Sequence, residues 1–307
     1  MAGDQAGFRP SEYLAPPYWP AWLVVGLLRA VVLLPYAWQC RLGRMLGTAL
    51  HYLHRKRRRI AATNIKLCFP DLSRAQRDAL VLDSFRHTGI GVFETALAWW
   101  GNAERLRKRC EIEGLQHLFD ALEHGKGVIL LTGHSTSLEM GGRLLALHTP
   151  LQAMYRTVRN KLVNAVTLKA RSGFLARIIL RTKLRTALRG LADNLPTWYA
   201  PDQDFGRHGT VFAEFMGVPA ATLVAPAKLA RISGAKVVPF FPYRLPDDAG
   251  FKLVLEPALE GFPSGDDHAD ARRVNDVLGR QIRKAPAQYM WVHRRFKTRP
   301  PGEPGFY

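Results

Sequence analysis

The chain has 307 residues and a formal net charge of +19, because 44 Lys and Arg outnumber 25 Asp and Glu. Its length allows one large domain or two small ones, and a hydrophobic share of 47% excludes a disordered chain. The positive charge predicts an acidic partner, whether nucleic acid, anionic lipid or an acidic protein. Cys40, Cys68 and Cys110 show no CxxC spacing, so neither a disulfide framework nor a zinc site is predicted, and a reducing compartment is favoured.

The first element along the chain is an apolar run at 19–38, WPAWLVVGLLRAVVLLPYAW. It is about long enough to cross the hydrocarbon core of a membrane, and aromatic residues lie at both ends, as they do at membrane interfaces. Arg29 in the middle would be costly at mid-bilayer but could snorkel from a helix lying flat in the interface. We predict that residues 1–40 anchor the protein in a membrane, spanning it or lying flat. A buried core helix is the alternative.

A basic region follows at 41–110 and is predicted to be helical. Its first part holds seven cations with no acidic residue between them: Arg41, Arg44, Arg55, Lys56, Arg57, Arg58 and Arg59. Arg9 is the only basic residue before the apolar run, so the positive-inside rule places the bulk of the protein in the cytoplasm. The RKRRR cluster is expected to contact anionic lipid headgroups, with a nucleic-acid patch as the competing interpretation.

From residue 73 onward the patterns indicate alternating helices and strands. Ser73 is a candidate N-cap for a helix over 74–100. Strands are predicted at 128–131, 151–155, 197–200, 236–243 and 251–255, and helices at 138–147, 162–180, 186–191, 220–233 and 267–284. This alternation predicts an α/β fold over 111–307, with a mostly parallel or mixed sheet layered by helices and a C-terminal surface tail.

The stretch GHSTSLE at 133–139 directly follows a predicted buried strand. We expect His134 in the strand-to-helix turn and Glu139 in the first turn of the next helix. The imidazole could then fold back toward the carboxylate, which would orient the ring as a general base. Such a base can take a proton from a hydroxyl as that hydroxyl attacks an acyl carbon. The alternative is two unrelated polar residues, which is common for so short a motif.

Other polar residues follow strands that are predicted to end at the same edge of the sheet. Arg156 could face a phosphate or an oxyanion there, with a solvated loop as the alternative. Asp202 and Asp204 follow the strand at 197–200. Two close carboxylates suggest a metal, but no further oxygen ligand is recognisable, so no metal is predicted. Asp202 is expected to hold an arginine in place.

The sequence resembles the H-x4-[DE] acyltransferases, and within them the late (secondary) acyltransferases of lipid A biosynthesis. The stretches that carry the resemblance are NIKLCFPDLS at 64–73, GHSTSLEMGGR at 133–143, MYRTVRN at 154–160, WYAPDQDFG at 198–206, ATLVAPAKLARISGAKVVPF at 221–240 and QYMWVHRRFKTRP at 288–300. The last of these is most similar to the lauroyl-type members.

The resemblance implies an enzyme on the cytoplasmic face of the bacterial inner membrane. Such an enzyme moves a fatty acyl chain from acyl carrier protein to a hydroxyl of an acyl chain on the Kdo-bearing lipid A precursor. By position, His134 would be the general base and Glu139 its partner, and Arg171 and Asp202 would be two further functional residues. The resemblance implies no cofactor beyond the acyl carrier protein thioester.

The expected partners are acyl carrier protein, the phosphorylated precursor and anionic inner-membrane lipids, but not nucleic acid. A basic run would attract them: Arg171, Arg177, Arg181, Lys183, Arg185 and Arg189. A myristoyl-type late acyltransferase and a glycerophospholipid acyltransferase remain alternatives, although no FPEGTR-like stretch follows the motif. A membrane-tethered basic binding protein is the non-enzyme alternative, without a recognisable nucleic-acid-binding signature.

Overall fold

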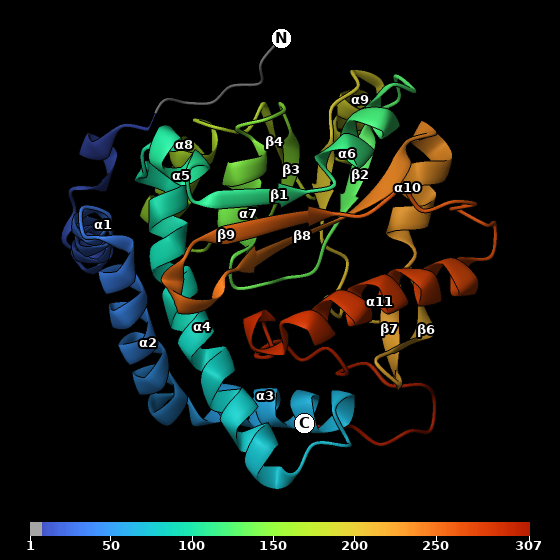
Figure 1. The fold of residues 1–307 in the computed structure, drawn as a ribbon, viewed down its shortest axis with the longest axis horizontal. Coiled ribbons are helices and arrows are strands. Elements are labelled where there is room, and N and C mark those ends of the chain that lie inside the picture. Colours follow the sequence, from blue (N-terminus) through green and yellow to red (C-terminus); the bar gives the residue numbers. More distant parts are fainter. Residues whose placement is uncertain (1–7) are drawn as a thin grey trace.

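The computed structural model describes residues 8–307. A seven-stranded sheet lies at its centre, with the strand order β1-β9-β8-β2-β5-β3-β4 (Figure 1). The strands are β1 (Cys110–Glu113), β2 (Val128–Leu131), β3 (Gln152–Tyr155), β4 (Arg177–Leu180), β5 (Thr197–Tyr199), β8 (Lys236–Arg244) and β9 (Phe251–Leu255). Neighbouring strands are parallel except β8 and β9, which are antiparallel. The predicted α/β fold with a mostly parallel, mixed sheet is confirmed.

Helices cover both faces of the sheet, and the side chains of β2 alternate between two hydrophobic cores. Ile129 and Leu131 pack in one core, while Val128 and Leu130 pack in the other. All four are fully buried because both faces are covered, which explains the continuous apolar run. The helices that follow the first strand are α6 (Leu115–Leu122), α7 (Leu138–Leu145), α8 (Lys161–Arg171), α9 (Leu184–Ala192), α10 (Ala225–Ser233) and α11 (Asp267–Lys284).

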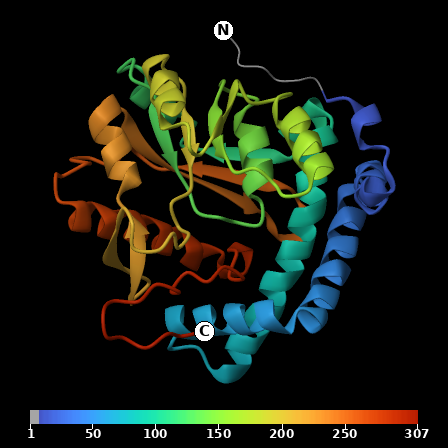
Figure 2. The same ribbon diagram turned by 180° about the vertical axis from the view of Figure 1, so that it is seen from behind.

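The N-terminal helices lie along one side of the sheet. They are α1 (Trp19–Val31), α2 (Tyr36–Leu53), α3 (Arg55–Cys68), α4 (Arg74–Trp100) and α5 (Ala103–Arg107). Ser73 caps α4 as predicted, in a capping box with Gln76. Helices α2 and α4 run side by side in both views (Figures 1 and 2). They approach closely because the contact is made of glycines: a Cβ added at Gly89 would lie 2.1 Å from the carbonyl oxygen of Gly43.

Residues 19–38 do not form the single helix that their length suggests. Helix α1 ends at Val31, and Pro35 is the N-cap of α2. Proline lacks the N–H that a continuous helix would need, so the break between α1 and α2 lies just before Pro35. Within residues 8–307, no helix is long and apolar enough to cross a membrane. Residues 1–7 of the predicted anchor segment lie outside the described residues, and the predicted boundaries at 40 and 110 stay predictions.

Two other expectations of secondary structure are wrong. The helix predicted at 162–180 ends at Arg171, and its last four residues form strand β4. The helix predicted at 220–233 begins only at Ala225, because the preceding residues form a hairpin of β6 (Thr210–Phe215) and β7 (Val218–Leu223). Short 3₁₀ helices complete the elements: η1 (Pro10–Tyr13), η2 (Pro16–Tyr18), η3 (Pro246–Asp248) and η4 (Pro286–Gln288).

The end of the chain is a surface tail that is attached at its last residue. Residues 301–305 are exposed, but the Tyr307 hydroxyl accepts a hydrogen bond from the Phe296 N–H at 3.2 Å. The same hydroxyl donates to the side-chain oxygen of Asn64 on α3. The tail is therefore exposed, as predicted, and its last residue is bonded to the body of the protein through its hydroxyl.

Candidate active site

The turn at 132–137 leads from the carboxyl end of β2 into α7. The Thr132 N–H donates to the carbonyl oxygen of Tyr199 at 3.0 Å, which extends the pairing of β2 with β5 by one residue. The chain then leaves the sheet, and the Met290 N–H donates to the carbonyl oxygen of His134 at 3.0 Å. His134 thus lies in the strand-to-helix turn and Glu139 in the first turn of α7, as predicted. The open carboxyl end of a parallel sheet is where α/β proteins build sites.

The imidazole of His134 pairs with the carboxylate of Asp202. Its Nδ1 lies 2.5 Å from Oδ1, and the His134 backbone N–H donates to Oδ2 at 2.9 Å. The hydroxyl of Tyr289 donates to the same Oδ2 at 2.8 Å. Asp202 is 1% exposed, whereas the His134 side chain is 26% exposed. The carboxylate is therefore held from three directions, while the imidazole keeps one side open to solvent.

The pKa values of this pair are displaced in opposite directions. Burial alone would lower the pKa of His134, but the charge of Asp202 and the hydrogen bond to it outweigh burial and raise this pKa. Burial would raise the pKa of Asp202, but His134 and the surrounding donors hold it far below its usual range. Asp202 is thus a carboxylate near neutral pH and accepts the Nδ1 proton, which leaves the lone pair of neutral His134 on Nε2. No hydrogen bond engages Nε2 in the part of the chain that the structure describes.

Glu139 has a different partner. Arg171 grips its carboxylate with two parallel hydrogen bonds, from Nε to Oε1 at 2.8 Å and from Nη2 to Oε2 at 2.5 Å. The indole N–H of Trp99 on α4 also donates to Oε1, at 2.7 Å. The guanidinium lies over the ring of Tyr155, 5.6 Å from its centroid. Helices α4, α7 and α8 thus converge on one carboxylate.

The expected contact between the His134 ring and Glu139 is wrong. Over residues 8–307, no hydrogen bond or ion pair joins them, because Asp202 occupies Nδ1 and Arg171 occupies both oxygens of Glu139. The expectation that Asp202 holds an arginine is wrong for the same reason. The structure places the four expected residues in two pairs, His134 with Asp202 and Glu139 with Arg171, neither of which was predicted from the sequence.

The two remaining candidates lie apart from these pairs. Arg156 follows β3, is exposed, and forms no ion pair within the described range. Asp204 binds the C-terminal segment: its Oδ2 accepts from the Thr298 N–H at 2.8 Å and its Oδ1 from the Thr298 hydroxyl at 2.9 Å. In residues 8–307, no group of three or more His, Cys, Asp or Glu side chains could hold a metal ion. The absence of a metal stays a prediction.

The sequence analysis did not predict two of the hydrogen-bond donors in the site, Tyr289 and Trp99. Tyr289 lies 87 residues from the carboxylate to which it donates, and Trp99 lies 40 residues from Glu139. The stretch at 288–300 was singled out for its resemblance, and that was the only signal for Tyr289. Aromatic residues at helical spacing usually indicate core packing, so nothing local marked either donor.

Two cavities lie at opposite edges of the sheet. One of about 30 Å³ adjoins the turn and is lined by apolar atoms of residues including Gly133, Ser135 and Tyr289. It has room for about one water molecule, far less than an acyl chain needs. The other, of about 480 Å³, is lined by residues 146–150 and 172–176, in the loops that lead into β3 and β4. Because those strands are parallel to β2, their amino ends lie away from His134.

The chemistry of the site follows from the two pairs. A neutral imidazole with a free Nε2, backed by a buried carboxylate, can act as a general base toward a hydroxyl or a water molecule. A guanidinium held by the carboxylate of Glu139 and lying over the ring of Tyr155 supplies a fixed positive charge, which suits a phosphate or a developing oxyanion.

Comparison with known proteins identifies close relatives. A family model described as bacterial lipid A biosynthesis acyltransferase matches residues 7–298. The chain is 38% identical over 297 residues to a lipid A biosynthesis palmitoleoyltransferase of Escherichia coli K12, covering 96% of this chain and 97% of that protein. It is 37% identical over 295 residues to the lauroyltransferase of the same organism, covering 96% of each chain. Identity to the myristoyltransferase of that organism is 29% over 294 residues, or 94% of this chain and 90% of the relative.

Proposed function

The chain belongs to the bacterial lipid A biosynthesis acyltransferases, and from this premise we propose that it moves a lauroyl chain from acyl carrier protein to a hydroxyl of an acyl chain on the Kdo-bearing lipid A precursor. Membership of the family makes the protein an acyltransferase enzyme. The observation that carries the proposed chemistry is the pairing of His134 Nδ1 with the buried carboxylate of Asp202, which leaves Nε2 free as a base.

In the proposed reaction, Nε2 of His134 takes the proton of the acceptor hydroxyl as its oxygen attacks the thioester carbon. The tetrahedral intermediate collapses by breaking the C–S bond, and the imidazolium returns the proton to the leaving thiolate. An ester and a free thiol result, without an acyl-enzyme. The state of the thiols supports direct transfer: Cys40 and Cys68 are buried, and burial raises the pKa of each to about 12.

Cationic side chains would balance the negative charge of substrates and intermediate. Arg171 is fixed by Glu139, whose carboxylate is itself held by Trp99, so it would meet an oxyanion or a phosphate with little reorganisation. Arg156 extends into solvent beyond β3, without an intramolecular ion pair in the described chain, and is suited to bind a phosphate of the acceptor.

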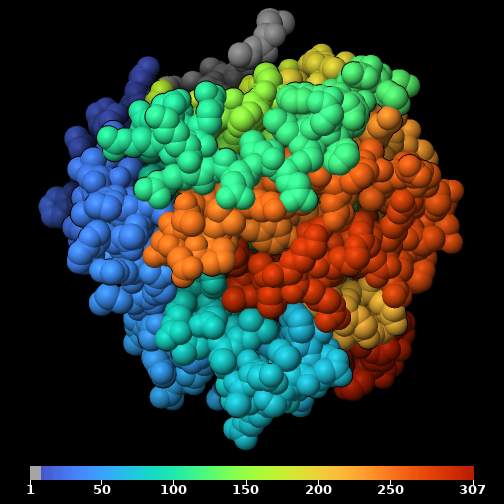
Figure 3. Space-filling model, in the orientation of Figure 1, coloured from blue at the N-terminus to red at the C-terminus, as the bar shows by residue number. Residues whose placement is uncertain are grey.

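The N-terminal helices support docking at the inner membrane. Apolar side chains are exposed along α1 and the start of α2: Trp19, Leu23, Val24, Leu27, Leu33, Leu34 and Trp38. The part of the chain coloured blue, which includes α1 and α2, lies on the left of the molecule in Figure 3. Such a stripe, together with the basic cluster at 55–59 beyond the other end of α2, suits the surface of an anionic leaflet. Because α1 packs against α4 and α8, which carry Trp99 and Arg171, a docked leaflet would lie next to the site.

Acyl carrier protein is the proposed donor partner. The exposed cations Lys183 and Arg185 follow β4 and form no ion pair in the described part of the chain, so their charge is available to an acidic protein. Arg181 lies over the ring of Phe205, in the loop after β5, 5.8 Å from its centroid. The carboxyl end of β4 is the same edge of the sheet that carries His134.

The test is transfer by the purified enzyme. Lauroyl, myristoyl and palmitoleoyl acyl carrier proteins are each offered with a Kdo-bearing lipid A precursor, and the products are identified by mass spectrometry. We expect an increase in mass of one lauroyl group, fastest with the lauroyl donor. A preference for another chain would correct the donor alone. Acylation of a lysophospholipid but not of the precursor would overturn the acceptor.

A further inference from the structure

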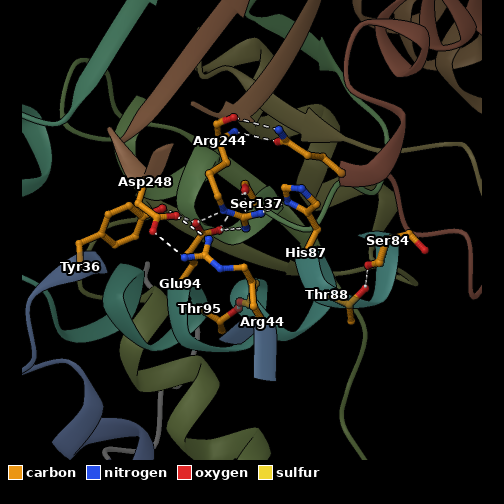
Figure 4. A network of polar contacts seen from close by, with 12 residues as sticks. Tyr36, Arg44, Ser84, His87, Thr88, Glu94, Thr95, Ser137, Arg244 and Asp248 are labelled. Carbon is orange, nitrogen blue, oxygen red and sulfur yellow. Dashed lines mark hydrogen bonds and ion pairs between the residues drawn. The ribbon is translucent and has the colours of Figure 1, made fainter. Parts of the chain in front are cut away.

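Behind the turn lies a second, fully buried ion pair, between Glu94 of α4 and Arg244 at the end of β8 (Figure 4). Arg244 donates from Nε to Oε1 at 2.6 Å and from Nη2 to Oε2 at 2.5 Å. The Tyr36 hydroxyl donates to Oε1 at 2.7 Å, and the Ser137 hydroxyl donates to Oε2 at 2.9 Å. Both charged side chains are 2% exposed. Each carboxylate oxygen therefore accepts two hydrogen bonds, with no room for substrate.

The guanidinium of Arg244 stays charged near neutral pH. The remaining terminal nitrogen of Arg244, Nη1, forms a hydrogen bond with Nδ1 of His87. Burial, and then the charge of Arg244, lower the pKa of His87 to about 4, so His87 is neutral and does not compete for Glu94. Burial alone would lower the pKa of Arg244, but the charge of Glu94 raises it further above its usual range.

The pair is joined to the turn that carries His134 by two routes. The first is Ser137, the residue before α7, whose hydroxyl contacts both Glu94 and Arg244 Nη2. Ser137 occupies the N-cap position of α7, but its side chain makes no cap hydrogen bond to that helix. A serine at this position usually caps its own helix. Here its hydroxyl is committed to the ion pair instead.

The second route runs through Gln288. Its side chain forms two hydrogen bonds with the backbone of Arg244, at 2.8 and 2.9 Å. The backbone carbonyl oxygen of Gln288 accepts a hydrogen bond from the Thr136 N–H at 2.8 Å. Helix α4 also presses on the turn directly, since a Cβ at Gly91 would lie 2.4 Å from the Thr136 carbonyl oxygen.

We propose that Glu94 and Arg244 are positioning residues, which hold the turn at 134–139 in the geometry needed for acyl transfer. Their side chains bind Ser137, and the backbone of Arg244 binds Gln288. They touch no reacting atom and act through the turn. The inference rests on the proposed function, because it names what orients that site. A buried ion pair is often dispensable for stability when both partners are replaced by apolar residues, so its four-way saturation fits a role in specifying geometry.

The first variant removes the hydrogen bonds between Ser137 and the ion pair and leaves Glu94 and Arg244 in place. In Ser137→Ala the pair remains intact, but the turn loses its side-chain tether. We expect a folded enzyme in which kcat falls about 10-fold or more while KM for donor and acceptor stays within about twofold, as expected when a base is misaligned. The matched control is Ser84→Ala, since Ser84 is equally buried on α4 but donates only to the carbonyl oxygen of Val81. It should keep wild-type kcat.

A second variant guards against instability as the cause. Glu94→Leu combined with Arg244→Met replaces both charges by apolar groups and leaves no charge unpaired. We expect it to fold cooperatively and to show the same fall in kcat. If Ser137→Ala and this double variant both keep kcat within about twofold of the wild type, the proposed positioning role is wrong.

A readout without substrate separates this inference from the proposed function. In both variants, hydrogen exchange at the amides of residues 134–140 should be about 10-fold faster or more, with exchange in β2 and α11 unchanged. Unchanged exchange throughout residues 134–140 would overturn the positioning role even if activity fell. A wild-type enzyme that transfers no acyl group to any acceptor, yet shows faster exchange in the variants, would overturn the proposed function alone.

Discussion

The two ends of the turn from His134 to Glu139 use carboxylates in opposite ways. Asp202 holds an imidazole, whose proton can leave, and the His134 side chain stays 26% exposed. Glu139 is held by Arg171, whose proton does not leave, and by an indole N–H. The difference teaches that a carboxylate partner provides a base when the paired cation titrates near neutrality and a fixed charge when it does not.

The largest effect should come from breaking the titrating pair. We expect His134→Ala to lower kcat about 10³-fold or more, because the step loses its base. Asp202→Asn should lower kcat about 10²- to 10⁴-fold, because the amide no longer fixes the proton on Nδ1. Steady-state transfer kinetics measure both, and circular dichroism checks that each variant is folded. Near wild-type turnover in either variant would rule out the base.

The fixed pair should give a smaller effect of a different kind. Arg171→Lys keeps the charge but loses the two-pronged grip on Glu139, so we expect kcat/KM to fall about 10- to 100-fold. The matched control is Arg177→Lys, because Arg177 makes a single hydrogen bond to Asp193 on the surface. It should change kcat/KM less than about twofold. Equal losses in the two variants would contradict a specific role for Arg171.

The pH dependence should distinguish the two pairs directly. His134 acts as a base only when neutral, and Asp202 raises its pKa above the ordinary value of 6.5. The wild-type kcat/KM should therefore rise with pH through a pKa above 6.5. In Asp202→Asn only burial remains, so the residual activity should rise through a pKa below 6.5. In Arg171→Lys, kcat/KM should rise with pH through the same pKa as in the wild type. A shift of that pKa would contradict the conclusion that the Arg171–Glu139 pair does not control the titration of His134.

The smallest effect should come from Trp99. Trp99→Phe removes one of the three hydrogen bonds to Glu139 and keeps most of the apolar ring. We expect a loss of about 1 kcal/mol in the free energy of unfolding and a two- to fivefold fall in kcat/KM. Urea denaturation and the transfer assay measure these quantities. A fall as large as that of Arg171→Lys would mean that the indole itself contacts the substrate.

Much of the fold was predictable because its signals are local. The buried run of β2, the periodicity and cap of α4, and the handover at Gly133 into α7 each depend on residues close in sequence. The errors fell where a local pattern is ambiguous. Residues 178–180 carry apolar side chains that suit a helix or a strand, and only the pairing with β3 makes this segment the strand β4.

The sequence by itself determined the family, the α/β class and the place of His134 at the end of a central strand. Only the tertiary structure decided which charges meet. Asp202 is 68 residues from His134, and Arg171 is 32 residues from Glu139. Partners at such separations are set by the order of parallel strands, because the carboxyl ends of β2 and β5 meet at one edge of the sheet. Spacing along the chain carries no record of that order.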